Sequence, residues 1–130
     1  MRVLVVDDAA VSRSAFARIA RAAGFDDVIE ATGVDAGLAL AAEARPDVVV
    51  VDGRLVRDLP ATFVAPLRER DSAVEIFVVV ALDEKALVRA ALRAGASGAL
   101  LRPVLLSQLV RILAPDGREA EDASRHDSAK

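Results

Sequence analysis

Three aspartates in the sequence directly follow apolar segments. Asp7 and Asp8 come after the apolar residues 3–6, and Asp52 comes after four consecutive valines at residues 48–51. Three carboxylates gathered in one pocket repel each other, so they must be protonated, paired with a cation or bound to a metal ion. Oxygen ligands without histidine or cysteine favour magnesium, and an exposed carboxylate beside such a cation can attack phosphorus as a nucleophile.

Parallel β-strands are the elements that would bring these aspartates together. Four β-branched residues in a row, without polar alternation, predict a strand that is buried on both faces in the middle of a parallel sheet. The carboxyl ends of such strands meet at one edge of the sheet, where ligands bind in open α/β folds. A single aspartate at a strand end more often caps a helix or begins a turn. The adjacent pair and the third aspartate on the central strand favour a site.

Apolar and helical patterns alternate along the whole chain. Strands are predicted at residues 3–6, 27–31, 48–51, 75–80 and 97–101, and helices at 9–23, 33–44, 61–70, 84–94 and 105–113. Thr32 and Asp83 are expected to cap the second and fourth helices, and Pro66 should shorten or kink the third. Five strands that alternate with five helices predict a doubly wound α/β sheet with right-handed crossovers.

The composition excludes several classes of function. The 130 residues suffice for one domain with its own core. A net charge of −3, a pI of about 5.2 and the lack of Trp and Tyr argue against nucleic-acid binding, which needs a basic surface or stacking aromatics. The lack of cysteine excludes disulfides and thiolate sites. The apolar start is too short for a membrane span or a signal peptide, so a cytoplasmic protein is expected.

The last residues differ from the rest of the chain. Residues 116–130 contain no Val, Ile, Leu, Met or aromatic residue, so a disordered polar tail at 115–130 is expected. The only histidine, His126, lies in it and is interpreted as solvated rather than catalytic. With a domain at residues 1–114 and no output domain after it, signals would have to pass through protein contacts.

Four motifs together resemble a known family. They are VLVVDD at residues 3–8, PDVVVVD at residues 46–52, AGASG at residues 94–98 and the Arg102–Pro103 pair. At this spacing, residues 1–114 resemble the receiver domain of two-component response regulators, with chemotaxis receivers among them. The resemblance implies a flavodoxin-like, five-stranded parallel sheet with strand order 2-1-3-4-5.

The same resemblance implies a phosphoacceptor and its partners. Asp52 would take a phosphoryl group from a sensor histidine kinase or a histidine phosphotransfer protein, and Arg102 would pair with that group. Asp8, Asp52 and the backbone carbonyl of Arg54 would hold Mg²⁺, which Asp7 would reach through water. Such transfer depends on positioning and charge neutralisation. The domain would be no enzyme beyond slow self-dephosphorylation, and would contact a downstream protein target or a second copy of itself.

Several positions depart from the family's pattern. Val80 stands where the family usually has Ser or Thr, and Ala99 replaces an aromatic residue that moves on activation. Arg102 replaces a lysine, and the loop after Asp52 lacks the usual Met-Pro. These changes predict an atypical, stand-alone receiver that keeps its phosphoacceptor but reads out phosphorylation through an altered switch.

Other interpretations remain open at this point. Arg54 and Arg57 either neutralise the acidic site without metal or are solvated, and the sequence favours neither. In a pseudo-receiver, Arg54 or Arg102 would fill the site permanently and the domain would act only as an interaction module. A small phosphatase with an aspartate nucleophile usually needs Asp-x-Asp, whereas Asp7 and Asp8 are adjacent. A flavodoxin-like cofactor carrier would need a hydroxyl-rich loop and aromatics, which are missing.

Overall fold

The structure is a computed structural model in which residues 1–113 are described. The predicted domain boundary at residue 114, the predicted tail and His126 lie outside these residues. The strands are β1 (Arg2–Val6), β2 (Asp27–Ala31), β3 (Val48–Asp52), β4 (Glu75–Val80) and β5 (Gly98–Leu101). The helices are α1 (Ala10–Ala23), α2 (Val34–Ala44), α3 (Ala61–Arg70), α4 (Lys85–Ala94) and α5 (Leu106–Leu113), with a 3₁₀ turn η1 (Gly53–Leu55) after β3.

The strands form one parallel sheet in the order β2-β1-β3-β4-β5, which confirms the expected topology. The register between β1 and β3 pairs Val3 with Val48 and Val6 with Val51. Asp7 and Asp52 therefore leave the sheet at the same edge, one after each of two neighbouring strands.

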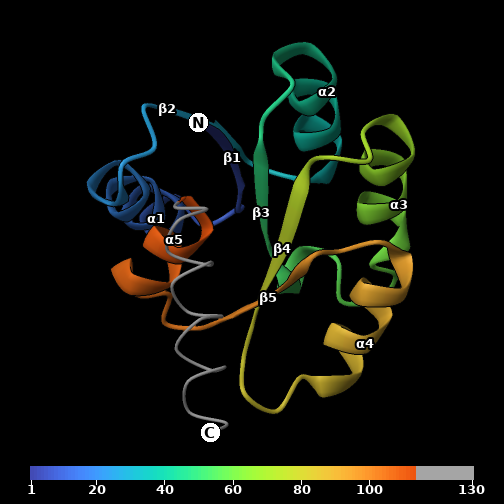
Figure 1. Ribbon diagram of the computed structural model, residues 1–130. Helices are drawn as coiled ribbons and strands as arrows, with labels where there is room; N and C mark the ends of the chain where they lie inside the picture. Colours follow the sequence, from blue (N-terminus) through green and yellow to red (C-terminus); the bar gives the residue numbers. More distant parts are fainter. Residues whose placement is uncertain (114–130) are drawn as a thin grey trace, which may run out of the picture.

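Helices cover both faces of the sheet (Figure 1). α2, α3 and α4 lie on one face, and α1 and α5 lie on the other. All five residues of β3 are buried, as its valine run predicts for a strand between two layers of helices. Burial of each such side chain contributes on the order of 1.5–3 kcal/mol, so the two apolar clusters fix the strand that carries Asp52.

The helix starts differ from the prediction. Gly33 precedes α2 and Glu84 precedes α4, and neither helix has a side-chain cap, so the assignment of Thr32 and Asp83 as caps is wrong. Before α4, the Glu84 carboxylate instead accepts a hydrogen bond of 2.8 Å from the backbone N–H of Ala81. That bond closes the turn after β4. The start of α4 is therefore set by the path of this loop, and not by Asp83, the first residue there whose side chain could cap a helix.

Candidate functional site

The predicted aspartates meet at the carboxyl edge of the sheet. Asp7 follows β1 and Asp52 ends β3, and the two residues are only 5% and 6% exposed. The side chain of Asp8 is 58% exposed at the rim. Two carboxylates are therefore enclosed by the fold, and the third borders the solvent.

A tight turn positions Asp52. The side-chain Oδ1 of Asp52 accepts a hydrogen bond of 2.9 Å from the backbone N–H of Arg54, the second residue of η1, and so caps this turn. A Cβ atom on Gly53 would lie 2.6 Å from the carbonyl oxygen of Val79, closer than real Cβ contacts come. Glycine at this position thus lets the turn pass directly beside β4.

The side chain of Arg54 closes back over Asp52. Its Nε donates to both carboxylate oxygens at 3.2 Å, and its Nη2 donates to Oδ2 at 2.9 Å. The same Nη2 lies 3.5 Å from Oδ1 of Asp7 and 3.6 Å from Oδ1 of Asp8. One guanidinium nitrogen therefore lies where the three carboxylates converge.

Arg102 holds the other side of the same carboxylate. It follows β5, and its Nη2 donates to Oδ1 of Asp52 at 2.9 Å and more weakly to the carbonyl of Val79 at 3.4 Å. Asp52 thus lies between two arginines that come from different loops. The long side chain of Arg102 still reaches the acceptor although it replaces the family's lysine.

The electrostatic state of Asp52 follows from these contacts. Burial raises the pKa of the Asp52 carboxyl, but the hydrogen bonds from the side chain and backbone of Arg54 and the charge of Arg102 outweigh it. The pKa of Asp52 therefore lies below its usual range, and the carboxylate is ionised at neutral pH.

Three residues that hold Asp7 were not predicted. Ser12 donates its hydroxyl to Oδ2 of Asp7 at 2.5 Å, and the backbone N–H of Ala9 donates to Oδ1 at 2.9 Å. Arg13 donates to the backbone carbonyl of Asp7 at 2.9 Å. Polar residues five and six positions after an aspartate, on the first turn of a helix, are a signal that could have indicated them.

The two loop arginines that the sequence left open behave differently. Arg54 reaches the acidic site, whereas Arg57 forms an ion pair of 3.1 Å with Glu84 and does not enter the site. Of the two possibilities that the sequence left open for these arginines, the structure has Arg54 at the acidic site and Arg57 outside it.

Val80 and Ala99, two of the positions at which the sequence departs from the family's pattern, lie together. Val80 is 1% exposed at the end of β4, and Ala99 packs against the same apolar cluster from β5. Between β5 and α4, a hollow of about 390 Å³ is lined mainly by apolar groups, with Val80, Leu82 and Ala99 among them. The small side chain of Ala99 leaves open space on this side of the site.

The donor set has the chemistry of a magnesium site, but an arginine stands at its centre. Asp7, Asp8 and Asp52 offer hard oxygen ligands, which suit Mg²⁺. Within residues 1–113, however, no three acidic, histidine or cysteine side chains are arranged so that they could bind a metal ion together. The carboxylates surround Nη2 of Arg54 instead. The residue types therefore suit a divalent cation, while the structure has a guanidinium among them.

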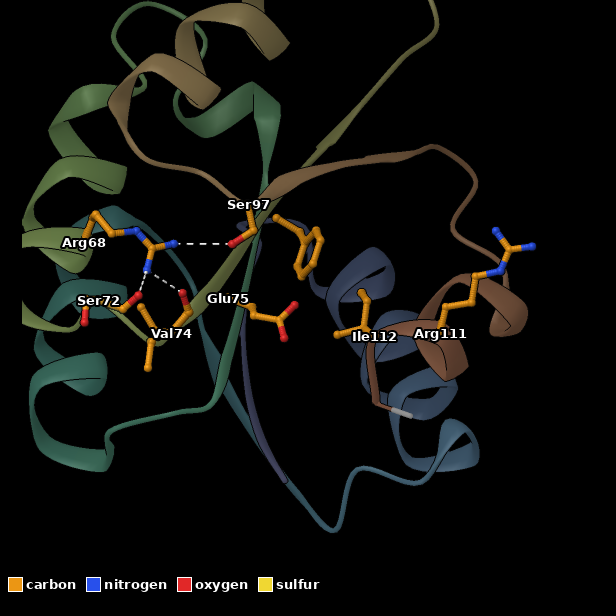
Figure 2. A pocket seen from close by; sticks show the side chains of 9 residues that line it. Arg68, Ser72, Val74, Glu75, Ser97, Arg111 and Ile112 are labelled. Atoms are coloured by element: carbon orange, nitrogen blue, oxygen red, sulfur yellow. Dashed lines mark hydrogen bonds between the residues drawn. The ribbon is translucent and has the colours of Figure 1, made fainter. Parts of the chain in front are cut away.

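A second cavity lies at the opposite edge of the sheet from Asp52 (Figure 2). It measures about 590 Å³ and lies at the amino-terminal ends of β4 and β5, whereas Asp52 lies at the carboxyl end of β3. Arg68 on its wall donates to backbone carbonyls of the loop before β4 and of Gly95, and to the hydroxyl of Ser97. The guanidinium of Arg68 is thus already hydrogen-bonded within the protein. It connects the loop before β4 with the loop before β5, so we do not interpret it as an anion-binding group.

No helix within the described residues is long and apolar enough to cross a membrane.

Comparisons with known proteins agree with the geometry. A family model described as the response regulator receiver domain matches residues 3–114. The chain is 30% identical over 112 residues to the chemotaxis protein CheY of Thermotoga maritima, covering 86% of this chain and 93% of that one.

Solved structures show the same fold. The signal receiver domain of NarL from Mycobacterium tuberculosis superposes with a TM-score of 0.77 at 30% identity, over 90% of this chain and 95% of that one. A response regulator from Burkholderia pseudomallei, described with a phosphorylated aspartic acid, a calcium ion and citrate, has a TM-score of 0.74 at 24% identity. The match covers 97% of this chain and 74% of that chain.

Proposed function

The chain belongs to the response regulator receiver domain family, and we propose that it accepts a phosphoryl group on Asp52 from a sensor histidine kinase or a histidine phosphotransfer protein. The observation that carries the proposal is the Asp52 carboxylate itself, which lies buried at the end of β3 with Nη2 of Arg102 at 2.9 Å from its Oδ1. The phosphorylated aspartic acid described for the Burkholderia structure supports it.

The proposed transfer needs few groups. One carboxylate oxygen of Asp52 attacks the phosphorus, the bond from phosphorus to the histidine nitrogen breaks, and its electron pair returns to the imidazole ring. Phosphoryl transfer of this kind depends on positioning and on neutralising the charge of the phosphoryl oxygens. Guanidinium groups suit that role because they donate two parallel hydrogen bonds to phosphate. Arg102 is placed for it beside Oδ1.

We assign Mg²⁺ as the cofactor of this reaction. Asp7, Asp8, Asp52 and the backbone carbonyl of Arg54 would hold it, and it would supply further positive charge to the phosphoryl oxygens. In support of this assignment, Ala9 and Ser12 fix the Asp7 carboxylate in place.

The output of the domain is assigned to protein contacts. We propose a cytoplasmic signalling domain that catalyses no reaction beyond slow self-dephosphorylation. It binds a downstream protein target or a second copy of itself, and neither nucleic acid nor a membrane. Its switch differs from that of the family because Val80 cannot donate a hydrogen bond to the phosphoryl group and Ala99 has no ring to move.

Intact mass spectrometry tests the phosphoacceptor. The protein is incubated with a small phosphodonor, such as an acyl phosphate, in the presence of Mg²⁺. We expect a mass gain of one phosphoryl group in the wild type and in the control Asp58→Ala, and none in Asp52→Ala. Asp58 is an exposed aspartate of the following loop. A gain that survives in Asp52→Ala would contradict the proposal.

One observation favours a second candidate, a receiver that is never phosphorylated and serves only as an interaction module. Arg54 already neutralises the acceptor and lies among the three carboxylates. The same experiment separates the two functions, because an unphosphorylated module shows no mass gain in any variant.

A further inference from the structure

The side chain of Arg54 stands in the position that a divalent cation needs. Its Nη2 lies within 3.6 Å of an oxygen from each of Asp7, Asp8 and Asp52. Arg102 also lies at the site, but within residues 1–113 it forms an ion pair with Asp52 alone. The guanidinium of Arg54 therefore neutralises all three carboxylates together, which is the task usually left to a metal ion at such a cluster.

A guanidinium and a divalent cation cannot share this position. Both are attracted by the same oxygens and repel each other at short range. The carboxylates carry three negative charges, and the two arginines already supply two positive ones. A doubly charged ion added to both arginines would give the pocket an excess of positive charge, so one cation must leave.

We propose that Arg54 is a built-in competitor of the divalent cation, so that Mg²⁺ enters the acidic site only when the Arg54 side chain swings out into solvent. The inference rests on the proposed function for the identity of the metal ligands, but it does not require that Asp52 be phosphorylated.

The structure lets Arg54 leave without disturbing the turn. Its side chain is 46% exposed, so solvent already reaches it. The turn itself is held by the backbone N–H of Arg54 on Oδ1 of Asp52 and by the Val56 N–H on the Gly53 carbonyl, and neither bond involves the guanidinium. The backbone carbonyl of Arg54 can therefore stay in place while the side chain moves.

Arg102 does not occupy the position that the metal ion needs. Its Nη2 donates to Oδ1 of Asp52 and to the carbonyl of Val79. Within residues 1–113 it forms an ion pair with Asp52 and with neither Asp7 nor Asp8. The exchange of cations thus concerns Arg54, and Arg102 remains beside the acceptor in both states.

Metal titration of the whole chain, without any phosphodonor, tests the exchange. Mg²⁺ is titrated into the wild type, into Arg54→Ala and into the control Arg57→Ala, and binding is followed by calorimetry and by backbone amide shifts. Arg57 lies in the same loop but pairs with Glu84. We expect Arg54→Ala to bind Mg²⁺ at least about tenfold more tightly than the wild type and Arg57→Ala. Equal dissociation constants in all three proteins would overturn the proposal.

Two further variants keep the test decisive if Arg54→Ala folds poorly. Arg54→Gln removes the charge at similar length, and Arg54→Lys keeps it. We expect Mg²⁺ to raise the melting temperature, measured by circular dichroism, more for Arg54→Gln than for the wild type and Arg54→Lys. An equal rise in all of them would refute the competition. The mass measurement on Asp52 is independent, so the failure of either proposal can be told from the failure of the other.

Discussion

Arg54 donates to both carboxylate oxygens of Asp52, the residue two positions before it in the chain, while its Nη2 faces Asp7 and Asp8. The residue two positions after Asp52 thus supplies a cation that neutralises it. This arrangement favours the ionised form of Asp52 in the folded protein. The free energy of unfolding should therefore depend on pH.

The stability of the protein should depend on the ionisation of Asp52. The pKa of Asp52 is lower in the folded chain than its unfolded value of about 3.9, because the arginine contacts outweigh the effect of burial. Its stabilising contribution is therefore fully present above that value and is lost as the pH falls through the folded pKa. We expect the free energy of unfolding to decrease as the pH falls below about 4, and to decrease less steeply in Asp52→Asn.

Urea denaturation followed by circular dichroism at several pH values measures this slope. Asp58→Asn, at an exposed position, should keep the wild-type slope. Equal slopes in the wild type and in Asp52→Asn would show that the acceptor contributes nothing to the acid sensitivity.

A methyl group at Gly53 should disturb the acceptor turn. The added Cβ would lie 2.6 Å from the carbonyl oxygen of Val79 and 3.0 Å from Cδ2 of Leu87. We expect Gly53→Ala to destabilise the protein by about 1–3 kcal/mol, the usual cost of overpacking, and to slow phosphorylation. Gly98→Ala is the control, because its Cβ would meet only the ring of Phe77 at 3.4 Å. Matching denaturation midpoints for the two variants would contradict this view of the turn.

Loss of the Arg68 side chain should weaken the opposite edge of the sheet. Arg68 reaches the loop before β4 and the loop before β5 at once (Figure 2). We expect Arg68→Met to lower the free energy of unfolding by about 1–3 kcal/mol, because several carbonyls lose their donor. Arg70→Met, at an exposed position of the same helix, should have little effect. Chemical denaturation of both variants checks the difference.

A hydroxyl at position 80 should strengthen the response to phosphorylation. Val80 is buried at the end of β4, and its side chain cannot donate a hydrogen bond. We expect phosphorylated Val80→Thr to show larger amide shift changes over α4 and β5 than the phosphorylated wild type. Val78→Thr is the matched control, because Val78 lies in the same strand and the same cluster but farther from the strand end. Indistinguishable shift changes in Val80→Thr and wild type would argue against a lost switch.

The sequence predicts the fold well because burial controls it. The valine run of β3 and the apolar runs of β1 and β4 need two covering layers, and the structure provides them. The strand order came from the family resemblance, since apolar pattern alone does not order parallel strands. The helix starts were predicted less well. Thr32 and Asp83 are good capping residues in general, but the chain path places Gly33 and Glu84 at the caps.

The site was predicted in its aspartates but not in its contacts. The placement of Asp7 and Asp52 follows from where strands end, which the pattern shows. The side chain of Arg54 is long and can adopt many rotamers, so its position depends on carboxylates that β1 and β3 bring together in three dimensions. The same reason applies to Ser12, whose bond to Asp7 exists only once α1 has packed.

The two arginines that hold Asp52 differ in how far along the chain they come from it. Arg54 is two residues away, whereas Arg102 is fifty residues away, follows β5 and reaches Asp52 past the end of β4. The entropy lost on closing a loop grows with its length, so the first contact belongs to a short peptide and the second to the assembled sheet. The bonds from Arg54 to Asp52 therefore lie within a single turn, whereas the bond from Arg102 exists only where β3, β4 and β5 lie side by side in the sheet.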